Sequence, residues 1–473
     1  MAPRPSARVF RKTPATIDDC GPAAHSNAPT RRRQQRARLP WLSALALLLA
    51  TAPLHALSID PLIQDASTLW QNSPDTFTPM ALPYGFQWSS LQRESARTAN
   101  RDLSLGPLRV IEAQARFSDQ KLSSLSLLLY SRGDSGEISR EAFEKIIRDG
   151  SAHLSTLTRS KPQNRGQDPA NAVRAEGLVW KTPGTLWTLE YSAARQNTPR
   201  GSSLLPEFVR LEITPEKSPA KTAQSVPRQT AFNPKQKIRK LPTGDVFIEG
   251  VPMIDQGDKG YCFPASGERV LRYYGMRADM HEIAQLAGNQ GKGTSLTGGL
   301  EGLKTAGLRL QFRVRVVDQP GFRDFENLVR EYNLRALKFG PKEQIPPLQG
   351  VVQVQTLLQK MRPDVLQAAR QAQKPEKNRF LRALQGAVDA GHPMIWGVLL
   401  GLVPEANAPQ TGGGHARLIV GYNARTQECL YSDSWGAGHE LKRMSFDQAW
   451  LIHQFCFLLI PQGIESPSLS QDK

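Results

Sequence analysis

Cysteine is scarce in this chain, and the few cysteines form no metal-binding pattern. Four occur among 473 residues, without a CxxC pair or a Cys/His cluster, so we expect neither a metal nor a cofactor. Cys20 lies in an N-terminal segment that we expect to be removed, which leaves Cys262, Cys429 and Cys456. Three is an odd number for an exported protein, so at least one thiol should be free or bound to another molecule. Cys429 and Cys456 lie in neighbouring predicted strands, and the sequence fits either a disulfide or two buried thiols.

Long apolar runs are also missing. The run from Trp41 to Ala52 is about 12 residues long, short of the roughly 20 that a membrane-spanning helix needs. It follows basic residues that begin at Arg31 and precedes small residues that end at Ala56, which is the order of an export signal. We therefore expect residues 1–56 to be a leader, the mature chain to be periplasmic or secreted, and no stable membrane span to remain.

Acidic residues are outnumbered by basic ones. The chain has 60 Lys and Arg against 43 Asp and Glu, a formal net charge of +17. Part of this excess lies in the leader and part in residues 217–240, where aromatic residues do not alternate with basic ones as in single-strand nucleic-acid binders. We interpret that segment as a solvated basic linker and expect no nucleic-acid partner.

The length predicts two folded domains. Residues 57–215 contain strand-like runs such as Leu108–Phe117 and Leu122–Tyr130, together with an amphipathic helix, and predict a smaller α+β domain of unknown role. Residues 216–243 are rich in Pro and Lys, as linkers are. Residues 244–473 predict helices first and an antiparallel sheet second, which is again an α+β arrangement.

Three local patterns in the second domain make specific predictions. Asp279 and Glu282 have the spacing of a capping box at a helix start. Apolar and polar residues alternate over 308–317, which predicts a strand. Two or three helices are expected in 322–390. Sheet signals then follow at 393–400, 416–422, 428–432 and 455–460.

Cys262 occupies a position where a thiol becomes reactive. It precedes Pro264 and the opening turn of a predicted helix, and a helix N-terminus lowers the pKa of a thiol. Six residues earlier, the side-chain amide of Gln256 is placed to donate to an oxyanion together with the backbone N–H of Cys262. One loop would then supply both the nucleophile and the oxyanion stabiliser.

A base and its orienting partner are predicted further along. His415 opens the strand 416–422, and the strand 428–432 leads into Asp433. A hairpin centred near Ala424 places His415 directly opposite Asp433, and directly opposed residues have Cβ atoms roughly 4.5–5.5 Å apart. The carboxylate would orient the imidazole, which would act as base toward the cysteine. A tryptophan at position 435 is expected to pack around this pair.

In this order, Gln256, Cys262, His415 and Asp433 resemble the papain-like cysteine peptidases. The sequence Asp433-Ser434-Trp435-Gly436 is similar to papain's Asn-Ser-Trp-Gly, and His415 follows Cys262 at roughly the family's distance of 130–150 residues. The lead-in to Gln256 and the segment Gly391–Ile395 most resemble the bacterial double-glycine-leader, or bacteriocin-processing, peptidases and their stand-alone relatives. The resemblance spans about residues 245–462 and implies a papain-like fold with these four residues in the active site.

The leading hypothesis is an exported cysteine-type peptidase that cleaves a peptide or protein substrate through a Cys-His-Asp triad and a covalent acyl-enzyme. One alternative is an envelope amidase acting on cell-wall peptides, since a basic protein suits an anionic wall. The other is an inactive papain-fold binding module in which residues 58–215 perform the recognition. We also expect the N-terminal domain to regulate the enzyme as a pro-region, and the linker 217–242 to be cut.

Overall fold

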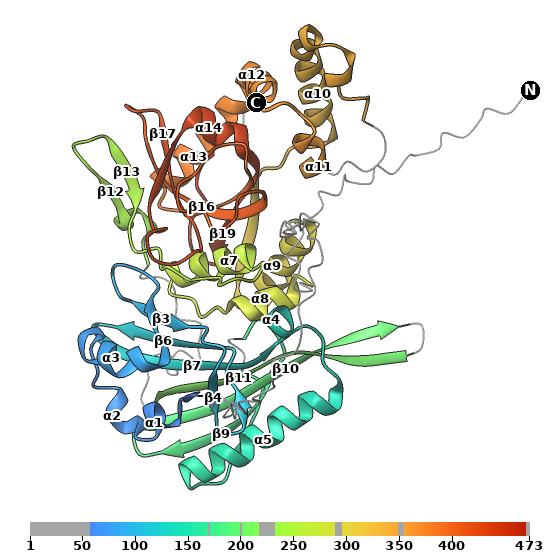
Figure 1. The fold of residues 1–473 in the computed structure, drawn as a ribbon. Helices are drawn as coiled ribbons and strands as arrows, with labels where there is room; N and C mark the ends of the chain where they lie inside the picture. The colour runs from blue at the N-terminus through green and yellow to red at the C-terminus, as the bar shows by residue number, and fades with distance from the viewer. Residues whose placement is uncertain are drawn as a thin grey trace, which may run out of the picture.

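The computed structural model describes residues 57–168, 171–198, 201–216, 232–288, 296–348 and 354–469. Within these residues the chain forms two large sheets, each with helices packed against it, which confirms the α+β class. Figure 1 shows the first sheet below and the second part of the chain above it. The predicted leader 1–56 and most of the predicted linker lie outside the described residues.

The first sheet has eight strands in the order β2-β3-β6-β7-β11-β10-β9-β8, and every neighbouring pair is antiparallel. Its strands are β2 (Gln87–Trp88), β3 (Ser95–Thr98), β6 (Glu112–Ser118), β7 (Lys121–Ser131), β8 (Gln163–Arg165), β9 (Glu176–Thr182), β10 (Thr185–Thr198) and β11 (Gly201–Pro215). A small separate sheet contains β1 (Leu57–Ser58), β4 (Leu103–Leu105) and β5 (Leu108–Arg109).

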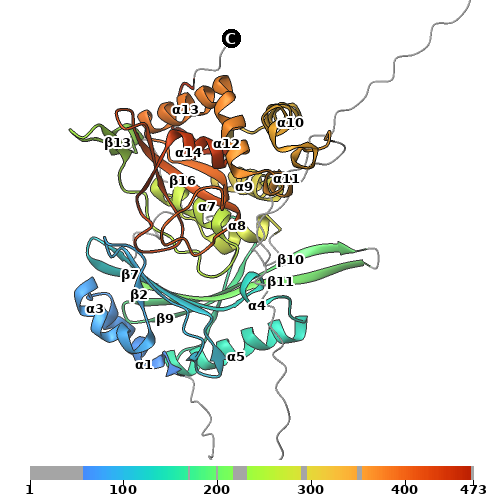
Figure 2. The same ribbon diagram turned by 45° about the horizontal axis from the view of Figure 1, so that its top comes forward.

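Helices cover one face of the first sheet. They are α1 (Asp60–Ile63), α2 (Ala66–Leu69), α3 (Pro74–Ala81) and α5 (Arg140–Thr158), with the short η1 (Leu82–Tyr84) after α3. The short α4 (Arg132–Ser135), which follows β7, lies instead on the side of the second part of the chain. Figure 2 shows α1, α3 and α5 on one side of this sheet and the second part of the chain on the other. The sheet therefore lies between its own helices and the elements that carry the candidate active site.

Local sequence signals explain two features of this domain. Asp119 and Gln120 have φ values of 50° and 61°, as in the two-residue turns whose twist matches that of a β-hairpin, and they join β6 to β7. The Ser139 side chain accepts a hydrogen bond from the backbone N–H of Ala142, which is the N-cap contact that begins α5. The predicted helix and the predicted strand pair are confirmed, except that the first strand of the pair begins at Glu112, because Leu108–Arg109 forms β5 of the separate sheet.

The second sheet runs β12-β13-β16-β15-β19-β14, and β17 and β18 extend from β16. Its strands are β12 (Ile238–Lys240), β13 (Asp245–Ile248), β14 (Phe312–Asp318), β15 (Met394–Leu400), β16 (Gly413–Asn423), β17 (Glu428–Ser432), β18 (Lys442–Ser445) and β19 (His453–Pro461). The expected strands at 393–400, 416–422, 428–432 and 455–460 are confirmed. β12 and the short η3 (Pro234–Lys237) fall inside the segment predicted to be a linker, so part of that segment is folded.

Helices surround the second sheet. They are α7 (Cys262–Tyr273), α8 (Met280–Leu286), α9 (Leu296–Leu310), α10 (Phe322–Ala336), α11 (Val354–Gln359), α12 (Pro363–Ala372), α13 (Lys374–Asp389) and α14 (Phe446–Ile452), with the short η4 (Leu337–Phe339) and η5 (Pro341–Glu343). The described part of 322–390 thus holds four α-helices, where two or three were expected. The number was underestimated because short helices separated by prolines and glycines contain too few turns to show a clear hydrophobic periodicity.

Two local predictions were wrong. The strand expected from residue 308 begins at Phe312, because α9 continues to Leu310 before Gln311 breaks it with a φ of 59°. Leu303, Ala306 and Leu310 are buried at helical spacing while Leu308 is 87% exposed. The capping box at α8 is also incomplete. Asp279 accepts hydrogen bonds from the first-turn N–H groups, but Glu282 binds the N-terminal domain instead of the helix start.

The two cysteines outside the candidate active site are free thiols. Cys429 on β17 and Cys456 on β19 are both fully buried, and neither forms a disulfide. Burial raises the pKa of both thiols. Of the two alternatives that the sequence left open, the structure has the buried thiols.

Candidate active site

Cys262 is the first residue of α7, so the helix begins one position earlier than the sequence predicted. The turn in front of it contains Gly257, whose φ of +68° favours glycine, and Pro264 lies in the first helical turn. The inner face of α7 packs on the second sheet through residues such as Val270 and Leu271, which are fully buried. Packing therefore fixes the axis of the helix, and the thiol at its N-terminus is held in place with only 4% exposure.

His415 and Asp433 meet inside the protein. Nε2 of His415 lies 3.0 Å from Oδ1 of Asp433, and both residues are fully buried. Strand β16 carries the histidine, and the aspartate follows the end of β17. The sequence predicted this contact.

The register behind that contact differs from the prediction. Leu418 pairs with Ser432, and continuing this register places Asp433 opposite Arg417 and not opposite His415. The connection between β16 and β17 has four residues, which start at Ala424, and a bulge near Val420 shifts the ladder again. The histidine and the aspartate are therefore diagonal neighbours, and diagonal pairs on one sheet face remain within reach of long side chains.

Cys262 completes the series. Cys262 and Asp433 both interact with His415 and raise the pKa of its imidazole. Since Nε2 binds the aspartate, Nδ1 is the ring nitrogen left to face the thiol. Burial by itself lowers the pKa of His415, but the interactions with Asp433 and Cys262 outweigh it and raise the pKa above its ordinary value. The arrangement favours an imidazolium beside a thiolate.

Asp433 is held in its charged form. Burial would raise the pKa of its carboxyl, but Arg417, His415 and Lys442 outweigh burial and keep the pKa well below the usual range. The backbone carbonyl of Asp433 also accepts a hydrogen bond of 2.8 Å from Arg269 on α7. This buried arginine joins the nucleophile helix to the residue that orients the base.

Trp435 shields the pair, as predicted. Its ring stacks on the imidazole of His415 with a centroid separation of 4.2 Å and an interplanar angle of 17°. An aromatic plane over the imidazole keeps water from the His–Asp hydrogen bond and strengthens it in a less polar environment.

Gln256 lies in the same site but is held more firmly than the sequence suggested. Its Oε1 accepts a hydrogen bond of 2.7 Å from Ser434, and its Nε2 donates one of 3.0 Å to the backbone carbonyl of Lys259. A primary amide has two N–H groups, so one remains for an oxyanion when Lys259 takes the other. The structure brings together all four predicted site residues, Gln256, Cys262, His415 and Asp433.

Three further residues support the site and were missed by the sequence analysis. Arg417 follows His415 by two positions, so strand periodicity places both on one face, and this was the available signal for it. Ser434 and Lys259 hold Gln256 through contacts that depend on how the chain folds back. No local sequence pattern predicts that Ser434 and Lys259 hold the side chain of Gln256.

Within the described residues, no group of three or more His, Cys, Asp or Glu side chains is arranged to hold a metal ion. In the same residues, no helix combines the length and the apolar character that crossing a membrane requires.

Part of the second domain matches a known family. Residues 353–455 match the sequence profile of the Peptidase_C39 like family. This segment includes His415 and Asp433 and does not reach back to Cys262 or Gln256. For this part of the chain, the predicted resemblance to the C39-like branch of the papain-like peptidases is confirmed. No curated protein matches the chain.

Two solved structures are similar to the chain. The peptidase domain of Streptococcus ComA, a bifunctional ABC transporter of a quorum-sensing pathway, is 14% identical with a TM-score of 0.24, covering 45% of this chain and 100% of that one. Xylellain, a cysteine protease from Xylella fastidiosa, is 11% identical with a TM-score of 0.24, covering 48% and 88%. At this TM-score neither similarity bears on the function of the chain.

Proposed function

We propose that the chain is a cysteine-type peptidase that uses Cys262 as nucleophile, His415 as base and Asp433 as the residue that orients the base. The hydrogen bond of 3.0 Å between His415 and Asp433, together with the interaction of Cys262 with the same imidazole, carries this proposal. The match of residues 353–455 to a C39-like peptidase family supports the same class of enzyme. The substrate is then a peptide or a protein.

The geometry supports hydrolysis in two steps. The thiolate of Cys262 attacks the scissile carbonyl carbon, and the oxyanion accepts hydrogen bonds from the backbone N–H of Cys262 and the side-chain amide of Gln256. The imidazolium of His415 gives its proton to the leaving amine, and a thioester acyl-enzyme remains. Neutral His415 then takes a proton from water, and the hydroxide attacks the thioester. The tetrahedral intermediate releases the acid and the thiolate of Cys262, while His415 keeps the proton, which restores the starting pair.

Replacement of the nucleophile tests the proposal. Cys262→Ala in the full chain should abolish hydrolysis of a protein substrate and leave the thermal midpoint nearly unchanged, since a small side chain at a helix start contributes little packing. Cys429→Ala removes another buried thiol far from His415 and is the matched control, which should keep its activity. Full hydrolysis by the Cys262→Ala variant would reject the proposal.

An envelope amidase remains the second candidate, because basic residues still outnumber acidic ones without the leader, which suits an anionic polymer. It would use the same site. Parallel digests of a protein and of isolated cell-wall peptides separate the two, since the first proposal requires cleavage of the protein.

We also propose that the chain is exported, on the order of charges and apolar residues in the predicted leader. Cell fractionation and N-terminal sequencing of the native protein test this. A mature N-terminus near Leu57 in an extracytoplasmic fraction is expected, and an intact N-terminus in the cytoplasm contradicts it.

A further inference from the structure

The loop between β13 and α7 carries Gln256 and leads directly into Cys262, and it contains a buried lysine. The side chain of Lys259 is 3% exposed. A buried ammonium without counter-ions is strongly unfavourable, so its partners decide whether the loop can hold this conformation.

Both carboxylates that pair with Lys259 come from the N-terminal domain. Its Nζ lies 3.0 Å from Oε2 of Glu112 on β6 and 3.2 Å from Oδ2 of Asp134 in α4. Burial would lower the pKa of Lys259, but Glu112 and Asp134 outweigh it and raise the pKa to about 12. The lysine is therefore charged, and its charge is balanced from the first domain.

Two other contacts hold the same loop from the same side. Arg97 on β3 pairs with Asp255 at 3.6 Å and with Glu112 at 2.9 Å. It also covers Gly257 so closely that a side chain at this position would meet the guanidinium. The ring of Tyr261 packs so closely on Gly133 that a side chain at Gly133 would meet the phenolic oxygen. Side chains and backbone of the first domain thus fit the loop along its length.

The fixed loop in turn fixes the oxyanion donor. The backbone carbonyl of Lys259 accepts the hydrogen bond from Nε2 of Gln256, so any movement of the lysine changes the direction of that amide. The N-terminal domain also contacts the loop between β17 and β18, which carries Trp435. There the backbone N–H of Leu91 donates a hydrogen bond of 2.9 Å to the side chain of Glu440. The N-terminal domain contacts both loops that flank the catalytic pair.

We propose that the N-terminal domain is an activating part of the peptidase, in which Glu112 and Asp134 position Gln256 through Lys259. This inference rests on the proposed function and gives the expected regulation by the N-terminal domain a direction. The two carboxylates are positioning residues, since they act on the oxyanion donor through the lysine. Under this proposal a cut in the linker leaves the domain bound by buried ion pairs, and the enzyme needs it for full turnover.

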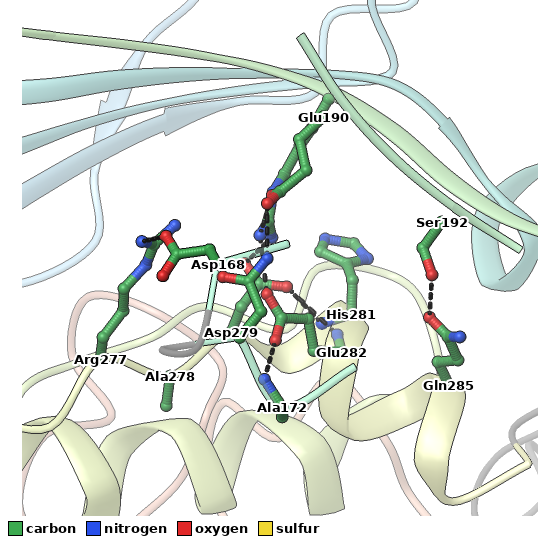
Figure 3. A network of polar contacts seen from close by, with 12 residues as sticks. Asp168, Ala172, Glu190, Ser192, Arg277, Ala278, Asp279, His281, Glu282 and Gln285 are labelled. Atoms are coloured by element: carbon green, nitrogen blue, oxygen red, sulfur yellow. Dashed lines mark hydrogen bonds and ion pairs between the residues drawn. The ribbon is translucent and has the colours of Figure 1, made fainter. Parts of the chain in front are cut away.

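Other contacts at the domain interface lie away from this loop and supply a control. Figure 3 shows Asp168 of the first domain beside Arg277, which it pairs with at 2.7 Å, and Ser192 bonded to Gln285 at 3.0 Å. These contacts hold the domains together through the segment before α8 and through α8 itself. Arg277→Gln therefore weakens the interface without acting on Lys259.

Full-length variants test the proposal. Glu112→Gln and Asp134→Asn each keep the shape of the side chain and remove its charge. Each should lower kcat about tenfold. This decrease is smaller than the roughly 10²–10³-fold decrease in kcat that follows complete loss of an oxyanion donor. KM and the rate of Cys262 alkylation by iodoacetamide should stay unchanged, because the thiolate–imidazolium pair is untouched. Arg277→Gln should keep the kcat of the parent chain.

A double-mutant cycle separates positioning from general destabilisation. In a Gln256→Ala background, Glu112→Gln should lower kcat no further, because the amide that it positions is gone. A further tenfold loss in that background, or parental kcat in both folded single variants, overturns the inference. If Glu112→Gln does not fold, Asp134→Asn carries the same cycle, since its side chain is 19% exposed. An active Cys262→Ala chain would instead reject the proposed function itself.

Discussion

Nε of Arg417 lies 2.9 Å from Oδ1 of Asp433, the same oxygen that binds Nε2 of His415 at 3.0 Å. Arg417 is fully buried and also pairs with Glu405 at 3.2 Å. A buried guanidinium needs a negative partner, and a neutral asparagine in place of Asp433 would leave it with Glu405 alone. This explains an aspartate at the position where papain has asparagine.

Asp433→Asn should therefore reduce turnover more than the likeness to papain suggests, by about 10- to 100-fold. Removal of the carboxylate also removes one cause of the raised pKa of His415. The imidazolium should then lose its proton at lower pH, so the alkaline limb of the kcat/KM profile moves to lower pH. Initial rates measured across pH 5–10 check this. An unchanged alkaline limb would show that Asp433 does not control the histidine.

Arg417→Met should lower the free energy of unfolding by about 3–5 kcal/mol, because the buried carboxylate of Asp433 and that of Glu405 lose the guanidinium that balances their charge. In the double variant with Asp433→Asn, the decrease in the free energy of unfolding should be clearly smaller than the sum of the decreases in the two single variants. Arg443→Met breaks the partly exposed pair with Asp245 and should cost at most about 1 kcal/mol. Urea unfolding measures all four variants, and additive losses would contradict the coupling.

Gln256→Ala should lower kcat by about 10²–10³ while the fold is kept, since the side chain is an oxyanion donor. Ser434→Ala removes only the 2.7 Å contact to Oε1 of Gln256 and should give a smaller loss, because the bond to Lys259 still orients the amide. Steady-state kinetics distinguish the two. A loss below tenfold for Gln256→Ala would mean that other groups form the oxyanion hole.

Acid should weaken the contact between the domains. Burial would raise the pKa of Glu112, but Lys259 and Arg97 outweigh it and hold the pKa well below the usual range. A depressed folded-state pKa contributes stability above the unfolded value of about 4.3, and this stability is lost as pH falls below it. Thermal midpoints between pH 7 and pH 3 should therefore fall less steeply for Glu112→Gln than for the parent. Glu144→Gln, at an exposed pair with Arg140, should follow the parent, and equal slopes for all three would contradict the role of Glu112.

The catalytic elements were predictable because their signals are local. Cys262 precedes a proline-marked helix start, and His415 and Asp433 flank one hairpin, so composition and short spacing suffice. The register was wrong because the length of a turn and a bulge near Val420 shift a ladder without a clear sequence signature.

Contacts between distant segments had no such signal. In the sequence, nothing distinguishes Lys259 from an ordinary loop residue or Glu112 from an ordinary strand residue. Their ion pair forms only because the fold brings β6 against the loop before α7. Glu282 was expected to cap its own helix, yet its carboxylate binds Arg210 of β11. Charge partners across a domain interface depend on tertiary packing, which periodicity does not encode.

The central claim is that Cys262 and His415 work as a pair, and alkylation coupled to activity tests it most directly. Full-length protein is treated with iodoacetamide at pH 6, and labelling of each cysteine is followed by mass spectrometry beside residual hydrolysis. An ordinary thiol with a pKa of about 8.5 reacts slowly there. We predict that Cys262 is labelled rapidly because its thiolate is stabilised by His415. Cys429 and Cys456, whose pKa values are raised by burial, should not be labelled, and hydrolysis should fall in proportion to the label on Cys262. Complete labelling of Cys262 with full hydrolysis would contradict the account.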